Sequence, residues 1–99
     1  MVKVGLFVKL HAKAGKEQEL GDFLKSALPL ANQEQGTAVW FALQFDKSTY
    51  GIFDAFADEG GRNAHLTGDI AKALMAKAGE LLASAPNIEK VDVMASKGA

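Results

Sequence analysis

The sequence has no cysteine, only two prolines and a single tryptophan among its 99 residues. The lack of cysteine excludes disulfide bonds, thiolate metal sites and a cysteine nucleophile, and it is compatible with a reducing compartment. The two histidines, His11 and His65, have no HxH or HxxxH spacing that would suit a metal ion. We therefore expect no metal site.

An excess of charge of one sign is also absent. Eleven Lys and Arg residues are offset by twelve Asp and Glu residues, and both kinds are scattered along the chain. No basic stripe could replace phosphate counterions, so nucleic acid is not an expected partner. The apolar run in residues 1–13 is short and interrupted by lysines, which does not suit a signal peptide or a membrane span. We expect a cytoplasmic protein.

What is present is the composition of an ordinary globular domain. Hydrophobic residues make up 48% of the chain, which is enough for one core. A length of 99 residues leaves no room for a second domain. We therefore expect a single domain over residues 1–99, with residues 96–99 as a frayed tail.

The hydrophobic periodicity predicts four strands separated by helices. An apolar stripe from Leu20 to Ala31 predicts an amphipathic helix, which Pro29 should either end near Leu28 or kink before Gly36. Asp58 is the expected cap of a short helix containing His65, and Asp69 the expected cap of a longer helix that Pro86 and Asn87 end. The strands are expected at residues 2–11, 37–45, 50–56 and 88–95.

This order is βαββαβ with an extra short helix before the last long helix, which predicts an α+β, ferredoxin-like fold with both main helices on one sheet face. Our assignment of strand faces puts six large apolar residues on the uncovered face: Phe7, Trp40, Tyr50, Ile52, Phe56 and Met94. Because so much exposed aromatic surface is costly, we expect a homodimer that joins two sheets face to face.

Three segments carry a family resemblance: HAKAGKEQELGDFLKSAL, the EQGT before the second strand, and FDAFADEGGRNAHLTG. Together they resemble the antibiotic biosynthesis monooxygenase family. The resemblance implies a dimeric α+β barrel and an enzyme that oxidises phenols or quinols without metal or flavin. It places Phe56 where many relatives carry a tryptophan and Asp54 where many carry a glutamate, and it aligns His65 with a pocket histidine. The haem-degrading branch is not expected, because the first strand lacks its asparagine.

His65 and Asp54 are the candidate catalytic residues. A histidine with an ordinary pKa of about 6.5 could accept a phenolic proton near neutrality, or it could simply pack at a helix end. Asp54 could orient His65, bind a substrate hydroxyl, or pair with Lys3 or Lys9 across the sheet.

Five further residues are candidate substrate-binding residues. The four aromatic ones could stack on a flat ligand or serve dimer packing, and the arginine could clamp an anionic substrate or remain on the surface. They are Phe7, Trp40, Tyr50, Phe56 and Arg62.

The leading hypothesis is a cofactor-independent monooxygenase acting on a hydrophobic phenolic or quinol compound. The alternative is a non-catalytic dimeric protein of the same fold that binds a small ligand or is associated with stress. A third reading is an interaction domain whose dimer has a filled interior.

Overall fold

A computed structural model describes all 99 residues. The chain forms four strands and four helices in the predicted order, with one helix more than expected because the first helical region is divided in two. In chain order they are β1 (Val4–His11), α1 (Glu17–Ser26), α2 (Leu28–Gln33), β2 (Thr37–Gln44), β3 (Thr49–Phe56), α3 (Glu59–Leu66), α4 (Asp69–Leu81) and β4 (Asn87–Asp92).

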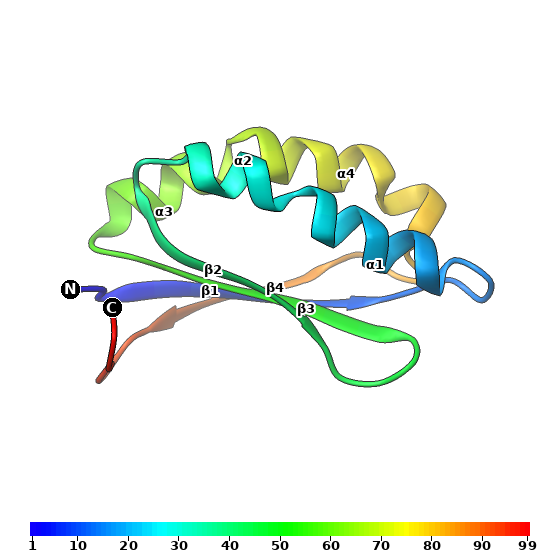
Figure 1. Cartoon of the computed structure of the whole chain (residues 1–99), viewed down its shortest axis with the longest axis horizontal. Coiled ribbons are helices and arrows are strands. Elements are labelled where there is room, and N and C mark those ends of the chain that lie inside the picture. Colours follow the sequence, from blue (N-terminus) through cyan, green and yellow to red (C-terminus); the bar gives the residue numbers. More distant parts are fainter.

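The strands form one antiparallel sheet in the order β2-β3-β1-β4. All four helices lie on the same face of this sheet and leave the other face without a covering layer (Figure 1). The predicted α+β, ferredoxin-like fold is confirmed. None of the helices combines the length and the apolar character needed to span a membrane.

Local sequence explains the helix boundaries. Pro29 lies in the first turn of α2, where its missing N–H costs no hydrogen bond, and α1 ends just before it. Asp58 caps α3 as predicted, because its carboxylate accepts a hydrogen bond from the Gly61 N–H at 3.0 Å. The predicted cap at Asp69 is wrong: Gly68 is the cap of α4, and Asp69 is the first helical residue, where its charge still favours the helix dipole.

The core lies between the sheet and the helices, and it shows that our face assignment was wrong for β2 and β3. Residues directly opposite in an antiparallel pair share a face. Tyr50 is opposite Leu10, Ile52 is opposite Val8, and Trp40 is opposite Asp54, so all of them face the helices. The error arose because both alternating sets in residues 37–56 are apolar, and a shift of one residue exchanges the two faces.

The uncovered face is nevertheless rich in aromatic rings. Phe41, Phe53 and Phe7 lie opposite one another across β2, β3 and β1, and Phe41 is 51% exposed. Phe7 was assigned correctly, whereas Phe41 and Phe53 take the places we expected for Trp40 and Phe56.

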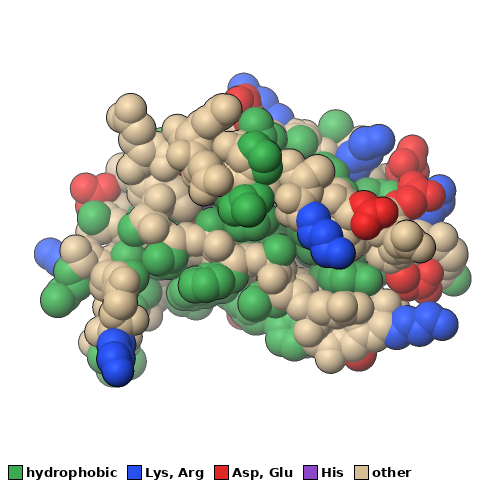
Figure 2. Space-filling view, in the orientation of Figure 1, with side chains coloured by type: hydrophobic (Ala, Val, Ile, Leu, Met, Phe, Trp, Pro, Cys, Tyr) green, Lys and Arg blue, Asp and Glu red, His purple; other side chains and the backbone are tan.

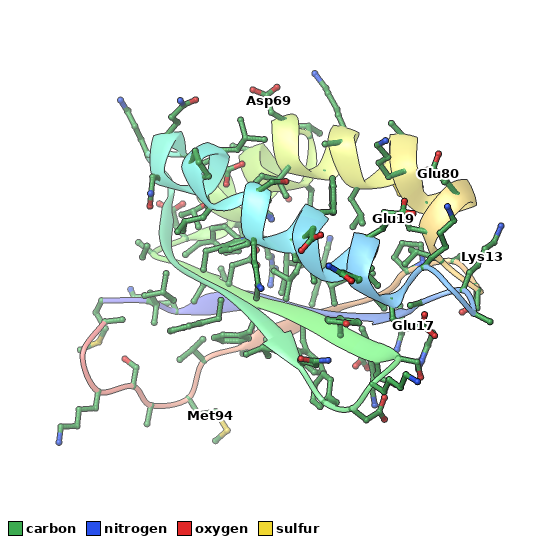
Figure 3. The ribbon with its side chains drawn as sticks, turned by 45° about the vertical axis from the view of Figure 1, so that its right-hand side comes forward. Lys13, Glu17, Glu19, Asp69, Glu80 and Met94 are labelled. Atoms are coloured by element: carbon green, nitrogen blue, oxygen red, sulfur yellow. The ribbon has the colours of Figure 1, made fainter.

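The outer surface separates apolar from charged regions. Hydrophobic side chains are visible along the sheet layer, whereas charged side chains gather at the end of the molecule where α1 begins (Figure 2). Lys13, Glu17, Glu19 and Glu80 lie at that end, and Met94 projects below the sheet, 98% exposed (Figure 3).

Candidate functional site

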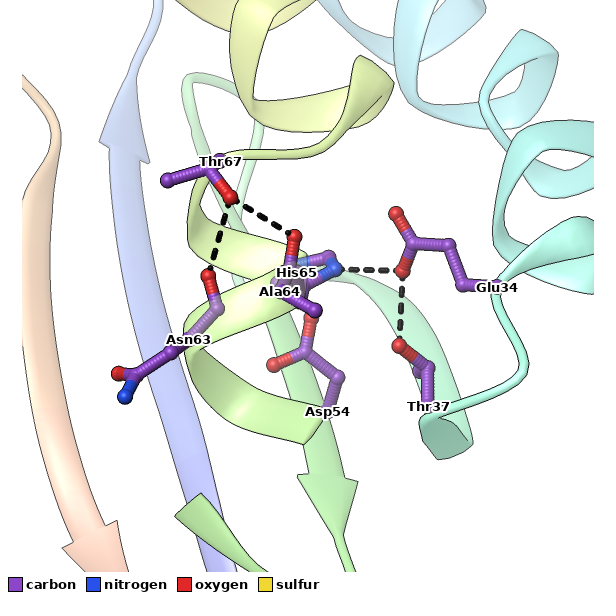
Figure 4. Close-up of polar contacts among 7 residues, drawn as sticks. All are labelled: Glu34, Thr37, Asp54, Asn63, Ala64, His65 and Thr67. Atoms are coloured by element: carbon purple, nitrogen blue, oxygen red, sulfur yellow. Dashed lines mark hydrogen bonds and ion pairs between the residues drawn. The ribbon is translucent and has the colours of Figure 1, made fainter. Parts of the chain in front are cut away.

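His65 on α3 lies between two carboxylates that come from different parts of the fold. Its Nδ1 is 2.6 Å from Glu34 Oε1, just beyond α2, and its Nε2 is 2.8 Å from Asp54 Oδ2 on β3. The imidazole lies between the two acidic side chains in Figure 4. We call Glu34, His65 and Asp54 the acidic triad.

The geometry of the triad fixes the charge of His65. A neutral imidazole has one N–H, so it would place a lone pair against one of the two carboxylates, whereas an imidazolium donates to both. Burial alone lowers the pKa of His65, but hydrogen bonding and charge from Asp54 and then from Glu34 outweigh it and raise the pKa to about 9. His65 therefore carries its proton at neutral pH, which differs from the ordinary pKa that our sequence-based role for it assumed.

Asp54 is completely buried on the helix side of β3. Its Oδ2 makes the ion pair with His65 at 2.8 Å, a contact that is not aligned as a hydrogen bond, and its Oδ1 has no polar partner. The alternative of pairing with Lys3 or Lys9 is wrong. Lys9 lies in the other alternating set of β1, on the open face, where its ammonium is 5.1 Å from the centre of the Phe45 ring.

Glu34 and Thr37 belong to this site although neither was a candidate from the sequence. The Thr37 hydroxyl donates to Glu34 Oε1 at 2.7 Å, while Glu34 Oε2 is buried without a partner (Figure 4). Both residues come from the EQGT segment on which the family resemblance partly rested. That motif was the available signal, because it carries an acid and a hydroxyl directly at the start of β2.

Two glycines bring the EQGT loop against α3. A Cβ on Gly36 would come within 2.9 Å of the Gly61 Cα, and a Cβ on Gly61 would come within 2.7 Å of the Gly36 carbonyl oxygen. Only glycine allows the two backbones to approach this closely. The contact holds Glu34 within reach of His65, one turn further along α3.

Arg62 anchors α3 to the sheet. It is only 6% exposed, its Nη1 donates to the carbonyls of Gly5 and Val91 at 3.3 Å, and its Nη2 pairs with Glu59 at 2.7 Å. The Glu59 pKa is lowered by this hydrogen bond and by the charge of Arg62. The guanidinium thus lies between α3 and strands β1 and β4, on the helix side of the sheet, and it lines none of the main pockets.

Two pockets meet at Glu34 and Thr37. One, of about 290 Å³, lies between the EQGT loop and the α3–α4 junction and includes His65 and Asp69. The other, of about 170 Å³, lies between α2 and the start of β2 and includes Trp40, whose indole N–H is buried without a partner. We call them the polar pocket and the tryptophan pocket.

The structure brings together some of the predicted site residues and separates others. Asp54 and His65 are in contact, and Phe56 is fully buried with its ring centre 5.5 Å from that of the imidazole. Trp40 lines a pocket that reaches the triad. Tyr50 lines a separate pocket of about 240 Å³ beside α1, and Phe7 lies on the open sheet face.

Comparison with known proteins gives similar solved structures at high and at low sequence identity. A protein of unknown function from Nitrosomonas europaea is 65% identical, with 98% of this chain and 94% of that chain covered and a TM-score of 0.97. Two solved structures share the fold at lower identity. A putative antibiotic biosynthesis monooxygenase from Caulobacter crescentus is 24% identical over 95% of this chain and 92% of its own, with a TM-score of 0.79. Another putative antibiotic biosynthesis monooxygenase, from Nitrosomonas europaea, is 13% identical over 93% of this chain and 99% of its own, with a TM-score of 0.83.

No protein-family model and no curated protein sequence matches the chain. The solved structures support an antibiotic biosynthesis monooxygenase-like fold, and the 65% identical Nitrosomonas europaea protein has no stated function.

Proposed function

We propose that this chain, which belongs to the same family as the 65% identical Nitrosomonas europaea protein, is a small monooxygenase that oxidises a hydrophobic phenol or quinol at the acidic triad. The observation that carries the proposal is a buried carboxylate oxygen, Glu34 Oε2, that has no partner at the junction of two pockets. The named fold neighbours support the reaction class.

Glu34 takes the role of proton acceptor in this proposal. His65 is already protonated and both its ring nitrogens face carboxylates, so it cannot take the substrate proton. A phenol hydroxyl donating to Glu34 Oε2 can transfer its proton there, and the imidazolium charge then stabilises the phenolate that forms. Asp54 holds the imidazole in place from the opposite side.

The oxidation needs no resident cofactor, because the phenolate itself supplies the electrons to dioxygen. A phenol plus dioxygen gives a quinone plus water: one oxygen atom enters the ring, and the other leaves with the hydrogens lost from the hydroxyl and the ring carbon. The protein contributes the position of the ring, the removal of water and the charge of the triad. Trp40 and its apolar neighbours would hold the ring.

The test is dioxygen consumption with a panel of one-ring and two-ring phenols and quinols. Glu34→Gln keeps the shape of the side chain and removes its ability to accept a proton, so turnover should fall by about a hundredfold or more. Glu19→Gln on the exposed surface of α1 makes the same chemical change away from the site and should leave turnover unchanged. Turnover that is equal in the two variants would remove Glu34 from the mechanism.

A second candidate is a ligand-binding protein without chemistry. It is favoured by the contacts of both His65 ring nitrogens with carboxylates, because an imidazolium held between two acids can also serve as a purely structural ion cluster. Native mass spectrometry of freshly purified protein separates the two functions. A stoichiometric ligand retained without dioxygen consumption would support binding alone.

We also propose that two copies pair through the open sheet face. The support is the row of Phe7, Phe41 and Phe53 on a sheet face that no helix covers. Two such faces together would bury these rings and enclose the barrel interior that the resemblance implies. The proposal gives the open face a partner but leaves the acidic triad within one chain.

A further inference from the structure

We infer that the site selects an uncharged aromatic hydroxyl compound and rejects the same ring carrying a carboxylate. The inference rests on the proposed function, because it concerns the ligand of the same two pockets. It is carried by the charges and the free hydrogen-bonding atoms that line them.

The charge around the pockets is negative. The residues that line the polar pocket and the tryptophan pocket include Glu34, Asp69 and His65 but no lysine or arginine. Asp54 lies directly behind His65 and offsets its positive charge. The site therefore holds three carboxylates, Glu34, Asp54 and Asp69, against the single positive charge of His65, and this excess of negative charge repels an anion.

Arg62 and the N-terminus of α4 could attract an anion, but both already have negatively charged neighbours within the chain. Arg62, on the same helix as His65, pairs with Glu59 and donates to two main-chain carbonyls of strands β1 and β4. The positive end of the α4 dipole faces the polar pocket, but Asp69 is its first residue. Glu34 Oε2 lies beside it as well, since a Cβ on Gly68 would come within 3.1 Å of that oxygen.

The free hydrogen-bonding atoms point to a hydroxyl. Glu34 Oε2 is a buried acceptor and Trp40 Nε1 is a buried donor, and neither has a partner. A hydroxyl can donate to the first and accept from the second, whereas an ether cannot donate and a carboxylate offers only acceptors at neutral pH. The pockets lie at or below the lower end of the roughly 300–1,000 Å³ typical of ligand sites, which suits one or two rings.

The experiment measures binding without dioxygen, so that it does not depend on turnover. The three probes are 1,4-naphthohydroquinone, 1,4-dimethoxynaphthalene and 1,4-dihydroxy-2-naphthoate, each titrated by anaerobic calorimetry at neutral pH. The fluorescence of Trp40, the single tryptophan, reports whether binding occurs in the tryptophan pocket. We expect the hydroquinone to bind at least about tenfold more tightly than the ether or the carboxylate.

A pair of charge variants identifies the origin of the selectivity. Asp69→Asn should improve binding of the naphthoate severalfold with little effect on the hydroquinone. Asp22→Asn changes the net charge by the same amount but lies on α1, away from both pockets, so it should leave the selectivity unchanged. Equal effects of the two variants would show a response to net charge alone and would overturn the inference.

Other outcomes are equally decisive. Equal or tighter binding of the naphthoate, or no binding of any probe, would overturn the inference. Selective binding without dioxygen consumption would uphold it while refuting the proposed enzyme. Turnover of the naphthoate as fast as that of the hydroquinone would support the proposed enzyme and overturn the inferred selectivity.

Discussion

The acidic triad should make the stability of the protein depend on pH in the neutral to alkaline range. His65 has an ordinary pKa of 6.5 when the chain is unfolded and about 9 in the fold, where it is only 8% exposed. A group whose pKa is raised by folding stabilises the fold most when the pH is below the unfolded value. That contribution is lost as the pH rises through the folded value. The loss therefore falls between about pH 6.5 and pH 9.

The magnitude follows from the same two values. A change from 6.5 to about 9 corresponds to about 3 kcal/mol of unfolding free energy. This is a large part of the roughly 5–15 kcal/mol that stabilises a typical domain. Urea unfolding at pH 6 and pH 9.5 should show this loss, with unchanged dependence on urea concentration.

The matched controls isolate the triad. His11→Gln in the exposed end of β1 removes the other histidine, so that a proton NMR titration of this variant follows His65 alone. Adding Glu34→Gln removes one of the two acidic partners and should move the His65 pKa down and shrink the pH-dependent loss of stability. A His65 pKa at or below 6.5, or unfolding free energies equal at pH 6 and pH 9.5, would refute the account of the triad.

Four further variants test the framework around the site and the open sheet face. Gly61→Ala should destabilise the fold by about 1–3 kcal/mol in urea unfolding, because the new Cβ would meet the Gly36 carbonyl oxygen at 2.7 Å. Gly79→Ala in α4 has open space and should instead stabilise it by about 0.5–1 kcal/mol, so a loss in both variants would contradict the steric reason. Asp58→Ala should cost about 1 kcal/mol in the same assay through loss of the α3 cap, whereas an unchanged midpoint would show that the cap bond adds nothing. Phe41→Glu should convert a homodimer into a monomer in light scattering, and a mass unaffected by this charge would exclude pairing through the open face.

The order of strands and helices could be predicted because each segment has a clear period and clear ends. The alternation in residues 2–11, the cap at Asp58 and the position of Pro29 each have a local physical cause, and each gave the observed element. The faces of β2 and β3 could not be predicted in the same way. Phe41 and Trp40 are adjacent aromatic residues on opposite faces, and only the pairing of β2 with β3 decides which one faces the helices.

The site was predictable in part for a similar reason. Asp54 and His65 stand out because a charged residue within an apolar strand and a histidine in the short helix that follows it are unusual. Glu34 does not stand out, since an acidic residue in a loop is ordinary until the fold places it 2.6 Å from an imidazole. The raised pKa of His65 depends on that third residue as well as on Asp54, so it could not be inferred from composition or spacing.

The hydrogen bonds of Arg62 make β4 part of the support of α3. One guanidinium nitrogen donates to a carbonyl from the first strand and to another, on Val91, from the last. Truncation before β4 would therefore strip a buried cation of one of its acceptors and loosen the helix that carries His65. Labels are better attached within the exposed residues 96–99, beyond β4, than in place of the final strand.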